Sequence, residues 1–178
     1  ALYSETVTVQ LENDFLPFLY PNQYVNFTPD SKASQLALSL IDEDTVDVDA
    51  LQQIYDYVVS NLTYDYEKAD TVTTGYLPDV DETLKTGTGI CFDYAALTTA
   101  MLRSCDIPCK LQIGYAGDIK HAWIDVYIRS KGWVNQAVSF KGDTWTLMDP
   151  TFDSNSDDKE AIQDYIGDES NYTVQFTR

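Results

Sequence analysis

Hydrophobic residues recur at spacings of three and four positions between Leu51 and Leu62, the spacing that places them on one face of a helix. With Asp47 or Asp49 as the capping residue, this pattern predicts a helix over Asp49–Asn61. A shorter helix is expected over Ala33–Ile41. A strongly apolar segment that follows a glycine-rich turn predicts a third helix over Cys91–Ser104.

The part of the chain after Pro108 carries runs typical of β-strands, separated by glycine-containing turns. Strands are predicted over Lys110–Tyr115, His121–Arg129, Gly132–Val138, Thr144–Asp149 and Tyr172–Thr177. In the second of these runs, apolar residues from Ala122 onward face one side, while His121 and Trp123 face the other. We expect Trp123 and Trp133 to pack on the sheet rather than to contact a ligand. Helices followed by a strand meander predict an α+β fold with an antiparallel sheet.

The remaining segments are less regular. We expect a strand or extended arm over Leu2–Leu11, a proline-punctuated loop region around residues 17–29, and loops with at most a short helical turn over Tyr64–Thr88. The tail adds an acidic loop over Asp153–Asp158 and a short helix over Glu160–Ile166. We expect residues 1–178 to form a single domain, with an N-terminal arm and short helix (1–45), a core (46–153) and a C-terminal helix and strand (154–178). The N-terminal segment could block or shape a cleft in that core.

Charge narrows the classes of partner. The 178 residues include 29 Asp or Glu and 11 Lys or Arg, for a net charge of −18. The basic residues are scattered, so a nucleic-acid surface is not expected. No apolar run approaches the roughly 20 residues that span a bilayer. We interpret the acidity first as a solvated surface.

A single histidine, His121, limits the catalytic chemistry that is open to the chain. A site with two histidine ligands is impossible, and any imidazole base must be His121. Cys91 stands at the predicted first turn of a helix, where free N–H groups and the helix dipole stabilise a thiolate or an oxyanion. Asp149 ends a predicted strand before Pro150 and is the candidate that would orient the imidazole.

Three ordered motifs make the chain similar to a known family. Gly89, Cys91, Asp93 and Ala95 fit the pattern G-x-C-x-[DE]-x-[AS]. His121, Ala122 and Trp123 fit H-[AS]-W, and Asp149, Pro150 and Thr151 fit D-[PA]-T. Together they resemble the transglutaminase-like superfamily, as found in many bacterial exported proteins, over about Tyr64–Asp153.

The resemblance implies a papain-like α+β fold with Cys91 as nucleophile, His121 as base and acid, and Asp149 as orienting group. It implies thiol-dependent acyl transfer on protein or peptide amides through a thioester. An aromatic hydrogen-bond donor often supports the oxyanion in such families; here Tyr64 is the first candidate and Tyr66 the next. By family habit, and because the printed chain starts without Met, we expect an exported protein. It would be extracellular or at the cell surface, where a missing N-terminal segment could attach it.

Several alternatives stay open at this stage. A cysteine peptidase or amidase fits the same residues, as does a non-catalytic cell-surface binding module. Cys105 and Cys109 could form a disulfide or remain thiols. Asp93 is expected to serve the helix N-terminus electrostatically. The acidic stretch from Asp153 lacks the glycine and final glutamate of an EF-hand, so at most weak cation binding is expected there. No metal ligands and no cofactor are predicted for the site.

Overall fold

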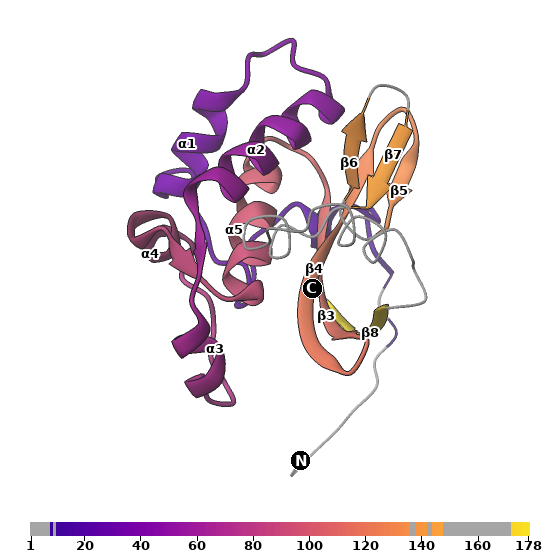
Figure 1. Ribbon diagram of the computed structural model, residues 1–178. Helices are drawn as coiled ribbons and strands as arrows, with labels where there is room; N and C mark the ends of the chain where they lie inside the picture. Colours follow the sequence, from indigo (N-terminus) through magenta and orange to yellow (C-terminus); the bar gives the residue numbers. More distant parts are fainter. Residues whose placement is uncertain (1–7, 9, 136–137, 142–143, 148–171) are drawn as a thin grey trace.

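The fold is seen in a computed structural model that describes residue 8 and residues 10–135, 138–141, 144–147 and 172–178. Its helices are η1 (Leu16–Phe18, 3₁₀), α1 (Lys32–Leu40), α2 (Asp47–Asn61), α3 (Tyr66–Thr71), α4 (Val80–Thr86) and α5 (Cys91–Ser104). Its strands are β1 (Thr63–Tyr64), β2 (Thr88–Gly89), β3 (Cys109–Ala116), β4 (Ile119–Ile128), β5 (Gly132–Val134), β6 (Val138–Lys141), β7 (Thr144–Leu147) and β8 (Tyr172–Thr177). The helices gather on one side of a curled sheet, with α5 between them and the strands (Figure 1).

Helix α5 is the centre of the core. Its residues from Asp93 to Arg103 are all buried, and it contacts α1, α2, α4, β3 and β4. A helix that is apolar on every side is stable only when it is enclosed, because a single exposed face would leave apolar side chains in water. The expectation of an apolar helix packed on an antiparallel sheet is confirmed.

The main sheet has the strand order β5-β4-β3-β8, and every neighbouring pair is antiparallel. On β4, Ala122 and Ile124 lie in the core, while Trp123 packs against Tyr172 of β8 on the opposite side. The predicted alternation is therefore confirmed. Gly114 on β3 permits the close approach of β8, because a Cβ there would lie 1.9 Å from the carbonyl oxygen of Thr173.

Two predictions about strands and loops were wrong. The strand expected over 132–138 ends at Val134, and Val138 belongs to β6, which pairs antiparallel with β7 in a separate two-stranded sheet. The segment 64–88, expected to be loops with at most one short helical turn, contains two helices, α3 and α4, and takes part in a parallel pairing of β1 with β2. Asp65 and Asp79 cap the two short helices, because their side chains accept hydrogen bonds from backbone N–H groups of the first turn. These two helices are too short to show a hydrophobic period, and the polar composition of the segment therefore suggested loops.

Other boundaries agree closely, with one correction at the start of α2. Asp47 is not a cap: its carboxylate is buried and accepts hydrogen bonds from the backbone N–H and the guanidinium of Arg129. Those hydrogen bonds hold the pKa of Asp47 below its usual range. Residue 8 and residues 10 and 11 are not in a strand. The rest of the N-terminal prediction, the acidic loop, the helix over 160–166 and Asp149 lie outside the described residues.

Arg103, in the last turn of α5, joins three distant segments. Its guanidinium donates to the carbonyl oxygen of Cys109 (3.0 and 2.8 Å), to that of Tyr20 (2.8 Å) and to that of Arg178 (3.0 Å). Burial lowers the pKa of Arg103 from its ordinary value, although a guanidinium stays protonated at neutral pH. One buried side chain therefore fixes the N-terminal segment, β3 and the end of β8 to the core helix.

Replacing this guanidinium should destabilise the whole fold. The substitution Arg103→Met leaves carbonyl groups without their donors, and each unsatisfied buried group costs about 1–3 kcal/mol. We expect the free energy of unfolding in urea to fall by about 3 kcal/mol. Lys32→Met, at an exposed lysine, is the control and should change it by no more than about 0.5 kcal/mol. Similar values for the two variants would contradict the structural role of Arg103.

Candidate active site

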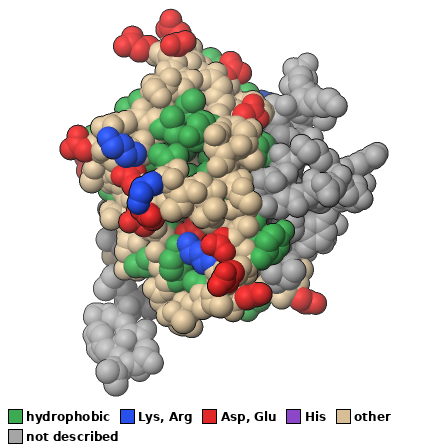
Figure 2. Space-filling view, turned by 60° about the vertical axis from the view of Figure 1, so that its left-hand side comes forward, with side chains coloured by type: hydrophobic (Ala, Val, Ile, Leu, Met, Phe, Trp, Pro, Cys, Tyr) green, Lys and Arg blue, Asp and Glu red, His purple; other side chains and the backbone are tan. Residues whose placement is uncertain are grey.

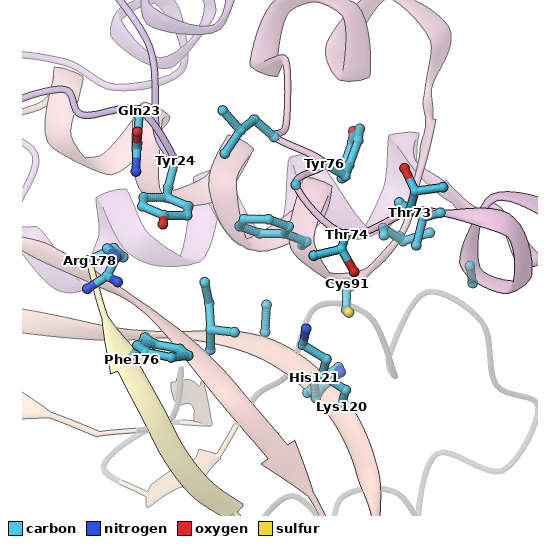
Figure 3. Close-up of a pocket in the computed structure, with 18 of the residues that line it drawn as sticks. Gln23, Tyr24, Thr73, Thr74, Tyr76, Cys91, Lys120, His121, Phe176 and Arg178 are labelled. Atoms are coloured by element: carbon cyan, nitrogen blue, oxygen red, sulfur yellow. The ribbon is translucent and has the colours of Figure 1, made fainter. Parts of the chain in front are cut away.

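A cleft of about 690 Å³ opens between the helical side of the molecule and the sheet. Its helical wall consists of Gln23, Tyr24, Tyr64, Ala69, Val72, Thr73, Thr74, Gly75, Tyr76, Leu77, Ile90, Cys91 and Phe92; its sheet wall consists of Ile113, Lys120, His121, Ala122, Phe176 and Arg178. Figure 3 shows Cys91 and His121 together at one end of this cleft, and Tyr24, Phe176 and Arg178 at the other. The volume lies in the range of roughly 300–1,000 Å³ that is typical of ligand-binding clefts.

Cys91 is the first residue of α5 and follows the N-cap Ile90. It is half-buried, and its sulfur points into the cleft (Figure 3). The first N–H groups of a helix have no acceptor within the helix, and they carry the positive end of its dipole. The position predicted from sequence is therefore the one observed, and it suits both a thiolate and a nearby oxyanion.

Asp93, two residues further on, fixes the start of this helix. Its fully buried carboxylate accepts the N–H of Ile90 (2.8 Å), the Nζ of Lys68 (2.7 Å) and the hydroxyl of Tyr76. Burial lowers the pKa of Lys68, but the hydrogen bonds to Asp93 and Tyr76 together outweigh burial, so the pKa lies above its ordinary value. Burial and the same carboxylate raise the pKa of Tyr76. Asp93 thus has the helix-terminal role expected from sequence, and it also ties α3 and the loop of Tyr76 to the start of α5.

Gly89 explains the spacing of the first motif. A Cβ at this position would lie 2.6 Å from the Cβ of Asp93, which folds back over the turn. Gly89 also pairs with Tyr64 in the parallel ladder of β1 and β2. Tyr64 is therefore paired with the residue two positions before Cys91, and Tyr64 and Cys91 both line the cleft. A glycine, a nucleophile candidate and a capping carboxylate at these spacings therefore form one local unit.

His121 comes from the opposite wall. It lies on β4 across from Gly114 of β3, and its side chain is buried. Its ring stacks on Trp123, with centroids 6.3 Å apart and planes at 16°, as expected for residues on the same face of a strand. Neither Trp123 nor Trp133 lines the cleft. Sheet and helix thus bring Cys91 and His121 together, whereas Asp149 lies outside the described residues.

The two tyrosines suggested as oxyanion donors occupy different positions. Tyr64 lines the cleft, and its ring contacts that of Tyr66 at a centroid distance of 5.0 Å. Tyr66 is 66% exposed and is not among the lining residues. The geometry therefore favours Tyr64 over Tyr66, in the order in which the sequence ranked them.

Several lining residues were not singled out from sequence. Tyr76 and the threonines before it form part of the helical wall, and they belong to a segment that composition assigns only to loops. Tyr24, Phe176 and Arg178 come from segments near the two ends of the chain, where no motif marks them. The N-terminal segment therefore shapes the cleft, one of the two roles left open from sequence.

Cys105 and Cys109 are both free thiols, so the disulfide alternative is not realised. Burial raises the pKa of Cys105 to about 11 and that of Cys109 to about 12. Neither residue lines the cleft. Their thiols stay protonated at neutral pH.

Within the described residues, no three His, Cys, Asp or Glu side chains gather closely enough to hold a metal ion. No helix in the described part of the chain is long and apolar enough to cross a membrane. Acidic side chains are spread over the face that carries the helices, with Lys and Arg groups among them (Figure 2). The negative charge of this face is distributed rather than gathered at one site.

The raised pKa values predict that thiol chemistry is selective. Because the thiolate is the nucleophile, Cys105 and Cys109 should react slowly with iodoacetamide at neutral pH. We expect mass spectrometry of the folded protein to find one fast label, on Cys91. Cys91→Ala should remove it, and Cys105→Ala should not. Equal labelling of Cys91 and Cys105 would contradict the predicted selectivity for Cys91.

The carboxylate of Asp93 should contribute more to the stability of the fold than the one hydrogen bond that it accepts from the hydroxyl of Tyr76. Asp93→Asn leaves the ammonium of Lys68, whose side chain is 31% exposed, without its counter-charge. We expect the free energy of unfolding to fall by about 3 kcal/mol, below the upper range for a fully buried pair. Tyr76→Phe removes one hydrogen bond and should cost about 1 kcal/mol. A loss for Asp93→Asn no larger than that for Tyr76→Phe would argue against a central ionic tie.

Similar proteins of known structure share this fold. The chain is 22% identical to a candidate cysteine protease from Cytophaga hutchinsonii, with a TM-score of 0.62 over 94% of this chain and 48% of that one. It is 19% identical to the periplasmic domain of TgpA from Pseudomonas aeruginosa, with a TM-score of 0.52 over 73% of this chain and 46% of that one. The chain therefore spans about half the length of these two structures.

Sequence comparison adds a curated relative and a family model. The chain is 36% identical to the UPF0252 protein of Methanocaldococcus jannaschii over 62 residues, which cover 32% of this chain and 18% of that protein. The model of the transglutaminase-like superfamily matches residues 34–150, which include Cys91, His121 and Asp149. Because this match covers more than half of the chain, the chain belongs to the transglutaminase-like superfamily.

Proposed function

We propose that the protein is a thiol-dependent enzyme that transfers the acyl group of a protein or peptide amide through a thioester on Cys91. The observation that carries this proposal is the meeting of two walls: Cys91 at the start of α5 and His121 on β4 line the same end of one cleft. His121 is the only imidazole in the chain. The family and the fold support thiol chemistry at this level.

In the proposed first step, His121 takes the proton of the Cys91 thiol, and the sulfur attacks the amide carbon. A C–S bond forms while the carbonyl π pair moves to oxygen. First-turn N–H groups of α5 and the hydroxyl of Tyr64 are the proposed donors to this oxyanion. As the C–N bond breaks, the imidazolium returns its proton to the leaving nitrogen, which departs as ammonia or an amine.

In the second step, an amine or a water molecule attacks the thioester carbon and releases Cys91. His121 accepts the proton of the attacking group and gives it to the departing sulfur. We propose that Asp149 orients the imidazole in both steps. The three motif residues then have the roles that the family resemblance implies for them.

Hydrolysis is the second candidate outcome of the same chemistry. Water and an amine compete for one thioester, so a peptidase or amidase needs no further residue. The similarity of the fold to a candidate cysteine protease favours keeping this alternative. A non-catalytic binding module on the same fold would need none of these steps.

We further propose that residues 1–178 form one exported catalytic domain that acts outside the cytoplasm. The likeness of the fold to the periplasmic domain of TgpA is compatible with export.

An ammonia-release assay separates these functions. With a glutamine-containing peptide, we expect the parent protein to release ammonia and, when a fluorescent primary amine is added, to link the label to the peptide. Cys91→Ala should reduce both by at least about 10³-fold, because no other described thiol lines the cleft. Cys105→Ala, the matched control, should retain both.

Three results have distinct meanings. Ammonia release without amine incorporation would assign hydrolysis. Cleavage of the peptide backbone without ammonia release would assign a peptidase. Retention of full activity in Cys91→Ala would contradict the proposed nucleophile, and a complete lack of turnover in the parent would favour the binding module.

A further inference from the structure

The cleft continues well beyond the reactive end. Its lining includes the apolar side chains of Phe92, Ile113 and Ala122. In the sheet, Ile113 pairs with Ala122 on one side and with Phe176 on the other, and the ring of Phe92 lies 6.4 Å from that of Tyr24. Arg178, Phe176 and Tyr24 close the far end, and Lys120 stands next to His121 at the near end (Figure 3). A ligand that occupies the whole cleft therefore passes from one cation, over apolar side chains, to another.

The charge of this cleft is opposite to that of the chain. Among the described lining residues there are two cations, Lys120 and Arg178, and no Asp or Glu. The whole chain has 29 acidic residues against 11 basic ones. In the part of the chain that the structure describes, neither lining cation forms an ion pair with a carboxylate. A positive lining on an acidic protein selects a negative ligand locally, while the remaining surface repels it.

Arg178 is held in place as a fixed binding group would be. Its main chain pairs with Leu111 through two hydrogen bonds of 2.8 and 2.9 Å, and its carbonyl also accepts from Arg103. Its guanidinium lies over the rings of Tyr24 and Phe176, at 5.0 and 5.2 Å from their centroids. One of its N–H groups donates to the carbonyl of Thr177 (3.0 Å). The aromatic contacts orient the planar group and leave further N–H donors for a ligand.

We propose that the cleft selects peptide segments with an acidic side chain a few residues away from the reactive amide, and that the guanidinium of Arg178 binds that carboxylate at the far end of the cleft. Lys120 adds attraction at the reactive end. The occupant is an extended peptide, because a ligand must reach both Cys91 and Arg178 and lie along apolar side chains between them. The inference rests on the proposed function for the identity of the reactive amide, but the charge preference concerns binding alone.

Binding can therefore be measured without turnover, using the Cys91→Ala protein. The probes are fluorescein-labelled peptides, acetylated and amidated at their ends, with a central glutamine among alanines. They differ only in carrying glutamate, serine or lysine at positions on both sides of the glutamine. We expect the glutamate peptide to bind about five- to tenfold more tightly than the serine peptide, and the lysine peptide to bind most weakly.

Variants identify the group responsible. Adding Arg178→Gln should remove most of the difference between glutamate and serine peptides, and Arg178→Lys should restore part of it. Lys120→Gln should reduce the difference to a smaller extent. Lys32→Gln is the matched control: it removes one positive charge from an exposed position outside the cleft and should leave the preference intact.

Equal binding of the three peptides, no measurable binding of any of them, or a preference that survives Arg178→Gln would overturn the inference. A loss of preference in Lys32→Gln equal to that in Arg178→Gln would also overturn it, because the effect would then come from net charge. Failure of the proposed function has a different signature. In that case the parent protein would show no turnover while the Cys91→Ala protein kept its preference for the glutamate peptide.

Discussion

The enclosure of α5 is the constraint on which the rest of the structure depends. A helix that buries every residue from Asp93 to Arg103 needs partners on all sides, and helices and sheet together supply them. Its two polar ends are then satisfied by specific side chains. Asp93 holds the N-terminal turn, and Arg103 binds three carbonyl groups at the other end. The apolar middle fixes the position of the helix, and the polar ends determine what is attached to it.

The two ends of α5 position the residues that line the two ends of the cleft. At the N-terminus, the tie of Asp93 to Lys68 and Tyr76 holds the helical wall beside Cys91. At the C-terminal end of α5, Arg103 donates hydrogen bonds to the carbonyl groups of Tyr20 and Arg178. These bonds hold the two segments from which Tyr24 and Arg178 reach the cleft. His121 is brought in by β4, which packs directly on α5. One helix thus organises both the end of the cleft that holds Cys91 and His121 and the far end that holds Tyr24 and Arg178.

Sequence reasoning succeeded where a pattern was long or chemically distinctive. The apolar run of α5 and the alternation of β4 led to the core helix and the sheet, and both Cys91 and the single histidine line one cleft. It failed for α3 and α4, whose Asp caps resembled ordinary loop residues, and for Asp47, whose partner Arg129 is distant in sequence. The far end of the cleft was missed for a related reason. Tyr24 and Arg178 meet only through tertiary contacts, and nothing in the local sequence records them.

The central claim is that the start of α5 and the face of β4 create a reactive thiol and imidazole pair. The most direct test is the rate of Cys91 alkylation by iodoacetamide at neutral pH, compared between the parent and His121→Ala. The account predicts that the parent reacts at least about tenfold faster than the variant, because the imidazole accepts the proton that the thiol must lose before the sulfur attacks. Equal rates in the parent and in His121→Ala would contradict the pairing.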